Sequence, residues 1–458
     1  MTQPTFVLLL AAGLAAACGC GSNGLTADGT SPPPDGRDGA VEVDDDSLEA
    51  FCSGSGPVVT VGDGEERHEE CTGAIAETTF VNALCTCHDV RLAGYLKTRA
   101  CDSDAASCAG ATDEGGGAVG IDNKYSVSAG YSDVGGSFAI AGPETSLFFG
   151  YVRARGDFRL AANATVPGYT TVARNAWFGG NFTGLGPVTI DGELHKQGRV
   201  TALPLTVGGD TFTEAVTIDL PCPCGDGEIL DVAPLVDDAR DHNDNATVGL
   251  SPTVLEQVVG DVEVTLECGR FYVEEVSGLG NIVVNVTGRV ALFVEGNIAA
   301  AGNLEFNLTP EGEIDIFVKG DLLLIGNASF GTKDRPAGTR IYVGGSGDIT
   351  LVGAGGFVGN VYAPRSLVTA TGYAEVYGSI FARDFVSPGY ASFVYDLAIE
   401  HAGDDCPVED VPPGVCMRCL GCTGGTACVD GACTDCRVDA DCCSQEVCVD
   451  GRCTTLIM

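Results

Sequence analysis

A short element of glycine, a polar residue and an apolar residue recurs along much of the chain. It closes two alternating stretches that start 24 residues apart, "VALFVEGNI" at 290–298 and "IDIFVKGDL" at 314–322. Glycine, Asn and Asp tolerate a positive φ, so each element can turn the chain between two strands. Alternate residues of both stretches are apolar, which directs one face of each strand inward. The element begins at Gly136, Gly156, Gly180, Gly192, Gly296, Gly302, Gly320, Gly347, Gly359 and Gly378.

A period of about 20–30 residues that contains strand, corner and strand is typical of a parallel β-solenoid. No coil can bury its inner face alone, so each coil stacks on the next at ~4.8 Å. We therefore predict a mainly β protein with a parallel, right-handed β-solenoid over 119–403. A β-sandwich also has short alternating strands, but its hairpins require no sequence repeat at a fixed interval of 24 residues.

Gly296 and Gly320 hold the same position in the two stretches that are 24 residues apart. Both are expected to lie at equivalent corners with positive φ, where a side chain would strain the backbone. Between these corners, Asp315 falls on the outward side of the alternation in 314–318. Replacing Asp315 is therefore expected to change stability little, whereas replacing Gly320 is expected to lower it.

The repeat is interrupted at about 222–260, where we predict a helical insertion. The stretch "EILDVAPLVDDARDHND" at 228–244 has apolar residues at helical spacing and predicts three or four turns against the solenoid. These apolar residues are Ile229, Val232, Leu235, Val236 and Ala239. Cys222 and Cys224 precede the helix and Cys268 follows it, so disulfides are expected to staple the insertion down. A redox-active Cys-x-Cys is the alternative, but no thioredoxin-like βαβ pattern surrounds it.

The first residues predict an exported protein. "FVLLLAAGLAAACGC" combines an apolar run with small residues and Cys, as in a lipoprotein-type signal peptide over 1–18. It is shorter than the ~20 apolar residues that a membrane-spanning helix needs. Cys18 is the expected lipidation site and Cys20 is the alternative. Residues 19–48 form an acidic linker rich in Gly, Pro, Ser and Asp, which cannot bury a core.

The 22 cysteines suit an oxidising compartment and are expected to form disulfides in small modules. The N-terminal module, over 49–118, contains Cys52, Cys71, Cys85, Cys87, Cys101 and Cys108. A disulfide knob over 404–458 repeats Cys-Val-Asp-Gly-x-Cys and contains Cys406, Cys416, Cys419, Cys422, Cys428, Cys433, Cys436, Cys442, Cys443, Cys448 and Cys453. Zinc at "CTCH" (85–88) and an iron–sulfur cluster at 416–428 are the alternatives. The first lacks a four-ligand set, and the second lacks the ferredoxin spacing and proline.

Several short sequence segments resemble a bacterial surface-domain family of β-helical, pilus-associated and choice-of-anchor proteins. They are "RVALFVEGNI", "TRIYVGG", "GFVGNVYAPRS", "EVYGSIFARDF" and "FVYDLAI". The resemblance spans about 120–400 and implies β-helical coils without transferring catalytic residues. The knob is similar to Cys-rich repeats in surface proteins of social proteobacteria of the myxobacterial type. A more distant resemblance is to ice-binding β-solenoids, which carry rows of Thr; the best match here is "VTATGY" at 368–373.

The charge balance and the scattered polar residues argue against several functions. A net charge of −39 opposes nucleic-acid binding, which requires clustered Lys and Arg. Asp237, Asp241 and Asp244 are expected to share one helix face, which makes them weak candidates for Ca²⁺. A solvated helix face is the simpler interpretation, and we expect no cofactor. The five His are scattered, and no Gly-x-Ser-x-Gly elbow occurs.

These observations predict a non-enzymatic cell-envelope lipoprotein, a surface scaffold or adhesin at the outer membrane or cell surface of a Gram-negative bacterium. Its expected partners are the membrane, through the N-terminal lipid, and an extracellular glycan or other envelope proteins. The alternative is a carbohydrate-active β-helix enzyme that acts on an extracellular polysaccharide. Such an enzyme would combine the acidic residues of the insertion, Asp238 included, with Arg365 and Arg383 on late coils.

Overall fold

The computed structural model describes residue 48 and residues 51–52, 58–61, 68–110, 115–225, 227–324, 326–353 and 356–404. It also describes four short strands between 427 and 455. The expected signal peptide, the linker, and the lipidation sites Cys18 and Cys20 lie outside the described residues. No helix within the described part is long and apolar enough to cross a membrane.

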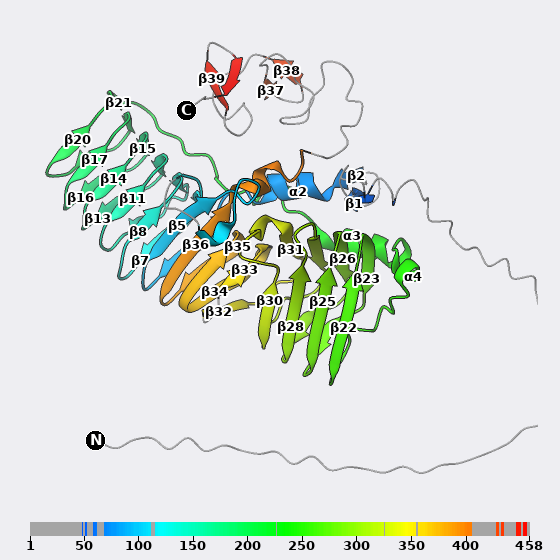
Figure 1. Cartoon of the computed structure of the whole chain (residues 1–458). Helices are drawn as coiled ribbons and strands as arrows, with labels where there is room; N and C mark the ends of the chain where they lie inside the picture. The colour runs from blue at the N-terminus through cyan, green and yellow to red at the C-terminus, as the bar shows by residue number, and fades with distance from the viewer. Residues whose placement is uncertain are drawn as a thin grey trace, which may run out of the picture. The chain divides into compact units, whose positions relative to one another are not determined.

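The described chain forms a parallel β-solenoid, as the sequence repeat predicted (Figure 1). One run of coils comprises β3 (Leu84–Thr86), β4 (Asp89–Leu92), β5 (Leu96–Cys101), β6 (Val119–Ile121), β7 (Lys124–Val127), β8 (Ser132–Val134), β9 (Phe138–Ile140), β10 (Ser146–Leu147), β11 (Val152–Ala154), β12 (Phe158–Leu160), β13 (Ala164–Val166), β14 (Thr170–Val172), β15 (Ala176–Phe178), β16 (Phe182–Gly184), β17 (Val188–Ile190), β18 (Leu194–Lys196), β19 (Val200–Thr201), β20 (Leu205–Val207) and β21 (Thr211–Thr213). The other comprises β22 (Asp261–Leu266), β23 (Gly269–Val273), β24 (Val276–Gly278), β25 (Asn281–Val286), β26 (Arg289–Val294), β27 (Ile298–Ala300), β28 (Asn303–Leu308), β29 (Glu313–Val318), β30 (Asn327–Phe330), β31 (Thr339–Val343), β32 (Ile349–Gly353), β33 (Phe357–Val358), β34 (Asn360–Tyr377), β35 (Ile380–Ser387) and β36 (Tyr390–Asp396).

The two runs join in the reverse of their chain order. The last coil of the later run pairs with the first coil of the earlier run, through β35 with β3 and β4 and through β36 with β5. Figure 1 shows the orange strands next to the blue ones at this junction. Residues 84–101 are therefore a coil of the solenoid. The predicted boundary at 118 between a separate module and the solenoid was wrong, because β3, β4 and β5 pair with β6, β7 and β8 beyond it as well as with the later run.

The polar residue of the recurring element links consecutive coils. The Asn297 side-chain oxygen accepts the N–H of Asp321 at 2.7 Å, and an Asp321 carboxylate oxygen accepts the N–H of Gly347 at 2.7 Å. In the earlier run, Asn163 and Asn181 do the same for backbone N–H groups 18 residues further along. Each side chain thus satisfies a backbone donor where the strand ladder is interrupted at the corner.

Gly296 and Gly320 are stacked as the 24-residue repeat predicted. The expected reason for requiring glycine at these corners, a positive φ, was wrong. The Gly320 N–H donates to the Gly296 carbonyl at 3.0 Å. Neither residue has a positive φ. A Cβ on Gly320 would instead lie 2.5 Å from the Gly296 carbonyl oxygen and 2.4 Å from the Asn297 side-chain oxygen. Glycine is required here because the coils approach closely.

The predicted helix is present as α3 (Val232–Asp241), ten residues long and slightly shorter than expected. The Asp231 side chain caps its first turn by accepting the N–H of Ala233. Its buried residues are Val232, Leu235, Val236 and Ala239, four of the five apolar residues that defined the pattern. The helix packs on β23, β26 and β29.

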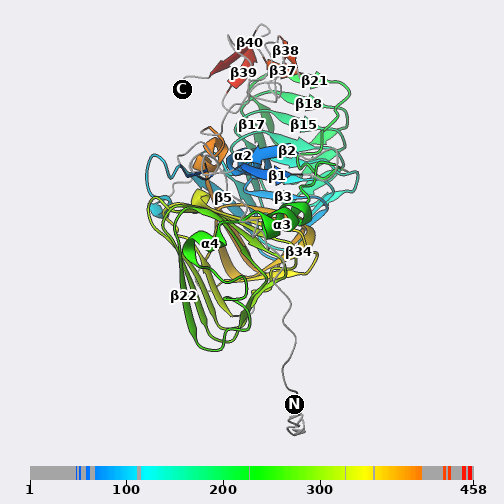
Figure 2. The ribbon, with the colours of Figure 1, turned by 90° about the vertical axis from the view of Figure 1, so that its right-hand side faces the viewer.

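The segment after α3 closes one end of the solenoid. It contains α4 (Asn245–Val248), and Figure 2 shows α4 across the first coil of the later run. The Asn245 side chain bonds both the N–H and the carbonyl of Tyr272 in β23, at 2.9 and 2.7 Å. The Asp244 carboxylate accepts the Arg270 N–H at 2.7 Å. The backbone groups of this edge strand are thereby satisfied.

Disulfides hold the insertion and the junction together. Two neighbouring bonds, Cys85–Cys222 and Cys87–Cys224, tie β3 and its corner to the segment before α3. Cys268 bonds Cys52, and Cys101 bonds Cys108. Cys71, which ends β2 (His68–Cys71), is also disulfide-bonded. β2 pairs antiparallel with β1 (Val58–Val61) and leads into α2 (Thr72–Thr79).

Both copies of Cys-Val-Asp-Gly-x-Cys in the knob form antiparallel hairpins. The strands are β37 (Ala427–Val429) with β38 (Ala432–Thr434), and β39 (Glu446–Val449) with β40 (Arg452–Thr455). Cys428 lies opposite Cys433 and Cys448 lies opposite Cys453. The other seven cysteines expected to form disulfides in the knob lie outside the described residues.

Asp315 faces away from the solenoid core as predicted but is buried, so the expectation that replacing it would change stability little was wrong. Its side chain is fully buried, and both carboxylate oxygens bond the Arg340 guanidinium, at 2.6 and 2.8 Å. Thr72 of α2 donates to the same carboxylate at 3.0 Å. Strand alternation places Asp315 opposite the solenoid core, but α2 and its neighbours cover that outer face and the ion pair is sealed beneath them.

Candidate functional surface

Six tyrosines form one row across six consecutive coils; we call this row the tyrosine ladder. From one end to the other its members are Tyr373, Tyr390, Tyr95, Tyr131, Tyr151 and Tyr169. Strand pairing fixes the order, since β34 pairs with β36, β36 with β5, β5 with β8, β8 with β11 and β11 with β14. The ladder therefore crosses the junction between the two runs.

The rings of the ladder are in direct contact. Neighbouring ring centroids are 4.2–4.6 Å apart, and four of the five pairs are stacked within 13° of parallel. Tyr95 and Tyr390 meet edge to face instead. The ends are the most open, with Tyr373 58% and Tyr169 38% exposed, while the members between them are partly buried. Stacking hides ring faces inside the row, so the surface presents ring edges.

A glycine precedes every tyrosine of the ladder and makes the stacking possible. A Cβ on Gly168 would lie 2.4 Å from the Gly150 carbonyl oxygen, and one on Gly150 would lie 2.1 Å from that of Gly130. The same close approach continues through Gly94 and Gly389. Only glycine lets these corners stack directly, and the rings that follow them then share one register.

Sequence reasoning missed the ladder although it left a clear signal. All six members occur as Gly-Tyr, and none of the other six tyrosines of the chain follows a glycine. Those other six are buried: Tyr125, Tyr272, Tyr342, Tyr362, Tyr377 and Tyr395. Every tyrosine that is not buried therefore belongs to one row.

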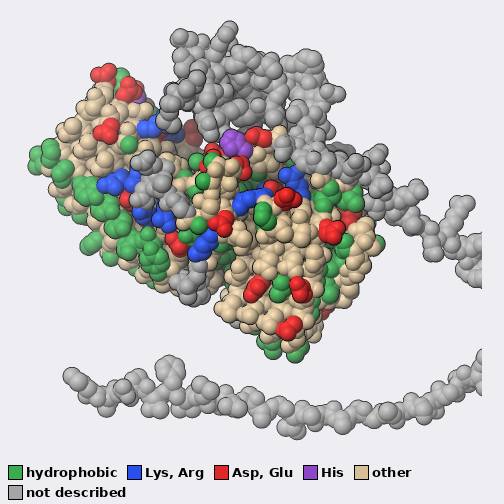
Figure 3. All heavy atoms as spheres, in the orientation of Figure 1, with side chains coloured by type: hydrophobic (Ala, Val, Ile, Leu, Met, Phe, Trp, Pro, Cys, Tyr) green, Lys and Arg blue, Asp and Glu red, His purple; other side chains and the backbone are tan. Residues whose placement is uncertain are grey.

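Polar side chains run beside the ladder in a second row, two residues further along each strand. Lys97, Asp133 and Arg153 are successive members. Asp133 pairs with Arg155 at 2.7 Å and with Arg153 at 3.6 Å. Arg99 pairs with Glu375 at 2.9 Å. Figure 3 shows a band of hydrophobic side chains across the coils with Lys and Arg beside it. Both carboxylates of this polar row are thus paired with arginine, and Asp133 is shared by two arginines.

A shorter aromatic row lies on another face near the last coils. Trp177, His195 and Phe212 stack at 5.1 and 4.8 Å, and the Arg159 guanidinium lies 4.8 Å from the Trp177 ring centroid. The two His195 ring nitrogens contact Glu214 at 2.7 Å and Glu193 at 3.3 Å. These contacts hold His195 within the row.

Two short rows of threonine also occur, each on consecutive coils. One comprises Thr165, Thr183 and Thr201, and the other comprises Thr171, Thr189 and Thr206. The threonine row expected at 368–373 is shorter than these two rows, because Thr369 pairs with Thr350 on one side and with Val386 on the other. Intervals of 17 or 18 residues separate members of the longer rows, so no short motif reveals them.

The three weak Ca²⁺ candidates do not share a helix face. Asp237 is on α3 and contacts Lys319 and Arg240. Asp241 ends that helix, whereas Asp244 lies beyond it as the N-cap of α4 and is fully buried against Arg270. The prediction of one acidic face was wrong because α3 stops at Asp241 and the chain turns into the cap of the solenoid.

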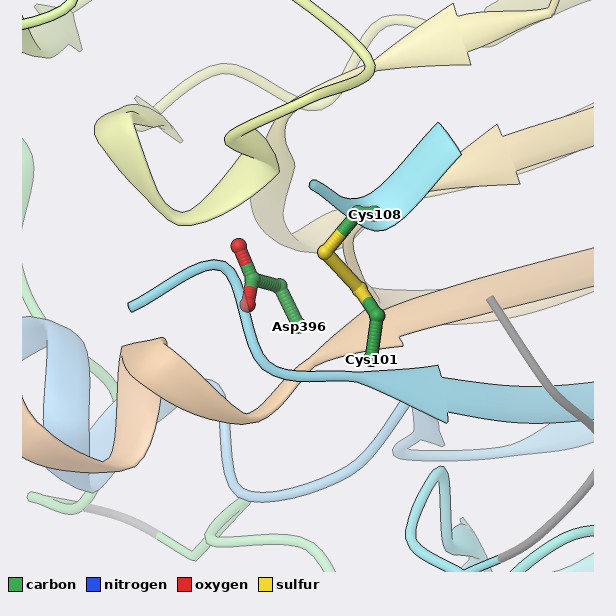
Figure 4. A group of neighbouring side chains, drawn as sticks. All are labelled: Cys101, Cys108 and Asp396. Carbon is green, nitrogen blue, oxygen red and sulfur yellow. A yellow bond between two sulfur atoms is a disulfide. The ribbon is translucent and has the colours of Figure 1, made fainter. Parts of the chain in front are cut away.

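One group in the described chain brings three metal-type ligands together, and it is a structural site. The ligand atoms of Cys101, Cys108 and Asp396 lie within 4.8 Å of one another (Figure 4). The two sulfurs are joined in a disulfide, so no thiolate is available to a metal. Asp396 accepts the backbone N–H groups of Ser103 and Ala337, both at 2.9 Å. It therefore anchors two loops at the junction.

Residues 227–402 match the family model of a domain of unknown function, DUF7305. The match includes α3 and the run of coils from β22 to β36. No curated protein matches the chain. Among solved structures, the chain is similar to the crystal structure of an ice-binding protein from an Antarctic bacterium of the Flavobacteriaceae. The identity is 14%, the coverage is 70% of this chain and 97% of that chain, and the TM-score is 0.13.

Proposed function

We propose that this chain is an exported, non-enzymatic surface scaffold or adhesin of the bacterial envelope. The observation that carries the proposal is the tyrosine ladder, which places every tyrosine that is not buried in one exposed row. Soluble proteins seldom maintain such a row without a partner, because exposed aromatic surface promotes association. A solenoid suits this role since it extends a contact surface coil by coil.

The disulfides support export to an oxidising compartment. Nine cysteines between residues 52 and 268 are disulfide-bonded. Such bonds persist outside the cytosol, where thiols are not kept reduced. The lipoprotein-like signal at 1–18 adds an anchor, with Cys18 as the lipidated residue and Cys20 as the alternative.

A Cys18→Ala variant tests the anchor. We expect the native chain to sediment with envelope membranes in high salt and the variant to remain in the soluble exported fraction. Cys20→Ala serves as the matched control and should leave the chain membrane-bound. A Cys18→Ala variant that still sediments would contradict lipidation at this residue.

The alternative, a carbohydrate-active enzyme, requires carboxylates and a basic residue on one surface. The residues suggested for it engage separate partners: Asp237 pairs with Lys319, Arg365 donates to the Gly344 carbonyl, and Arg383 pairs with Asp384. This arrangement favours the scaffold. Release of reducing or unsaturated ends from a polysaccharide panel by the purified chain would overturn it.

The threonine rows favour a second binding function, at the surface of ice. Ordered hydroxyls repeat at the coil spacing of ~4.8 Å on two faces of the earlier run. Thermal hysteresis measured on the purified chain tests this function. A Thr183→Tyr and Thr189→Tyr double variant should abolish any hysteresis, while its unfolding temperature should stay close to that of the native chain.

A further inference from the structure

We propose that the tyrosine ladder binds a neutral polysaccharide that lies along the solenoid axis. This inference deepens the proposed function, on which it rests, by naming the class of partner. Gly-Tyr dipeptides from both runs of the chain converge on one row, although the runs stack in reversed order.

The exposed chemistry of the ladder suits an oxygen-rich ligand. A tyrosine ring is negative on its face and positive at its edge, and stacking leaves the edges outward. Positive edges attract the lone pairs of hydroxyl and ring oxygens. Each phenolic hydroxyl has a donor and acceptor sites; the hydroxyls of Tyr131 and Tyr151 use part of this capacity on each other and offer the remainder to a ligand. A row of edges and hydroxyls therefore favours sugar over a purely apolar ligand.

The repeat of the ladder suits a linear polymer. Tyrosines recur at every coil, with centroids 4.2–4.6 Å apart over six coils. A polysaccharide also presents similar groups at regular steps along one line. Many weak contacts can then act together, because each added contact on one chain is intramolecular. A single sugar would engage one or two rings and bind far more weakly.

The charges select a neutral polymer. The chain carries a net charge of −39, which repels polyanions. The arginines beside the ladder attract a polyanion less than free arginines would, since Arg153 and Arg155 share Asp133 and Arg99 contacts Glu375. The polar row instead provides hydrogen-bonding groups next to the rings.

The ends of the ladder offer a second type of contact. Tyr373 and Tyr169 have only one ladder neighbour each and are its most exposed members. Exposed Phe149 lies two residues before Tyr151, and exposed Leu185 lies in the corner of the next coil, where Gly186 approaches Gly168. These apolar groups can cover the C–H faces of sugars that extend beyond the tyrosine hydroxyls of the ladder.

The test uses the purified full chain with insoluble cellulose and chitin, and with soluble neutral and acidic polysaccharides of matched length. We expect depletion by at least one neutral polymer. Affinity should fall at least tenfold in a Tyr131→Ala and Tyr151→Ala double variant. A double variant with Phe at both positions keeps the stacking and should lose part of the affinity. Trp177→Ala, on the other aromatic row, is the matched control and should bind normally.

Unfolding temperatures measured on all variants separate lost contacts from lost folding, and the Phe variant should remain close to native. Binding to no neutral polymer, tighter binding to acidic polymers, or native affinity in the Ala double variant would each overturn the proposal. Capture of a peptide or protein in place of every glycan would overturn it too. The Cys18→Ala localisation test is independent, so an anchored chain that binds no neutral polymer contradicts this inference alone.

Discussion

At the scale of single residues, close approach between coils explains why glycine is required at Gly320. Its missing Cβ would meet the Gly296 carbonyl oxygen at 2.5 Å. Backbone cannot move aside as a flexible side chain can, so we expect Gly320→Ala to cost about 1–3 kcal/mol of unfolding free energy. Gly260 has open space around the same position, and Gly260→Ala is the control. Equal unfolding temperatures for the two variants would contradict close stacking at Gly320.

Asp315 is the residue for which the sequence pattern was most misleading. Alternation could show that it faces away from the solenoid core but not that α2 covers it. Asp315→Asn would leave the buried Arg340 guanidinium with Glu313 as its only carboxylate partner, at 3.2 Å. Breaking a buried ion pair costs about 3–5 kcal/mol. Chemical denaturation should show this loss, and exposed Glu305→Gln in β28 should show little change. Similar stability in both variants would exclude a structural role for the pair.

Asp122 makes the stability of the protein depend on pH. Burial raises the pKa of its carboxyl to about 7, nearby Glu228 adds to the rise, and the Cys222 N–H opposes it. Between its usual pKa of 3.8 and 7, the folded chain holds a proton here that the unfolded chain releases. The unfolding free energy therefore falls as pH rises through this window and levels off above it.

Asp122→Asn should remove this part of the pH dependence, because the amide oxygen can still accept the Cys222 N–H. Calorimetry at pH 5 and pH 8 measures the change in unfolding temperature. Exposed Asp348→Asn should retain the native difference between the two pH values. If Asp122→Asn also retained it, Asp122 would not be the responsible group.

At the scale of elements, sequence patterns predicted local structure well. Each recurring Gly-polar-apolar element lies next to or at the start of a strand, as at Phe138, Phe158, Phe182 and Ile380. The apolar spacing in 228–244 correctly predicted α3, although the observed helix is shorter than that stretch. The same patterns could not show that 84–101 joins two runs of coils, because its neighbours on one side are β35 and β36, almost 300 residues away. The Gly-Tyr dipeptides mark the members of the ladder in the sequence, but their order in space could not be predicted because it differs from their order in the chain.

The paired disulfides at the junction also act at this scale. Removing Cys87–Cys224 by a double Ser substitution opens a link between residues separated by 137 positions. We expect a loss of about 2–5 kcal/mol, since long loops gain the most from closure. Cys101–Cys108 spans only 7 positions, and its removal should cost less. Thermal unfolding that shows the reverse order would mean that the junction does not depend on this closure.

At the scale of the whole molecule, two runs of coils assemble in reversed order into one solenoid. The residues that match the family model include the run that ends at β36, and the earlier part of the chain continues the stack from there. Two of the six ladder tyrosines lie within the matched residues and four lie outside them. The ladder therefore exists only if the two runs join as described.

Arg91 provides the most direct test, because it lies between two coils. It pairs with Ser126 on one side, within the same run, and with Val386 on the other side, across the junction. Register partners on neighbouring strands are close enough for a disulfide. Two double cysteine variants, Arg91→Cys with Val386→Cys and Arg91→Cys with Ser126→Cys, are compared by peptide mass spectrometry without reductant. We expect both to form the engineered disulfide within one chain. A bond from position 91 to 126 without one from 91 to 386 would show that the runs do not join, and would contradict the account.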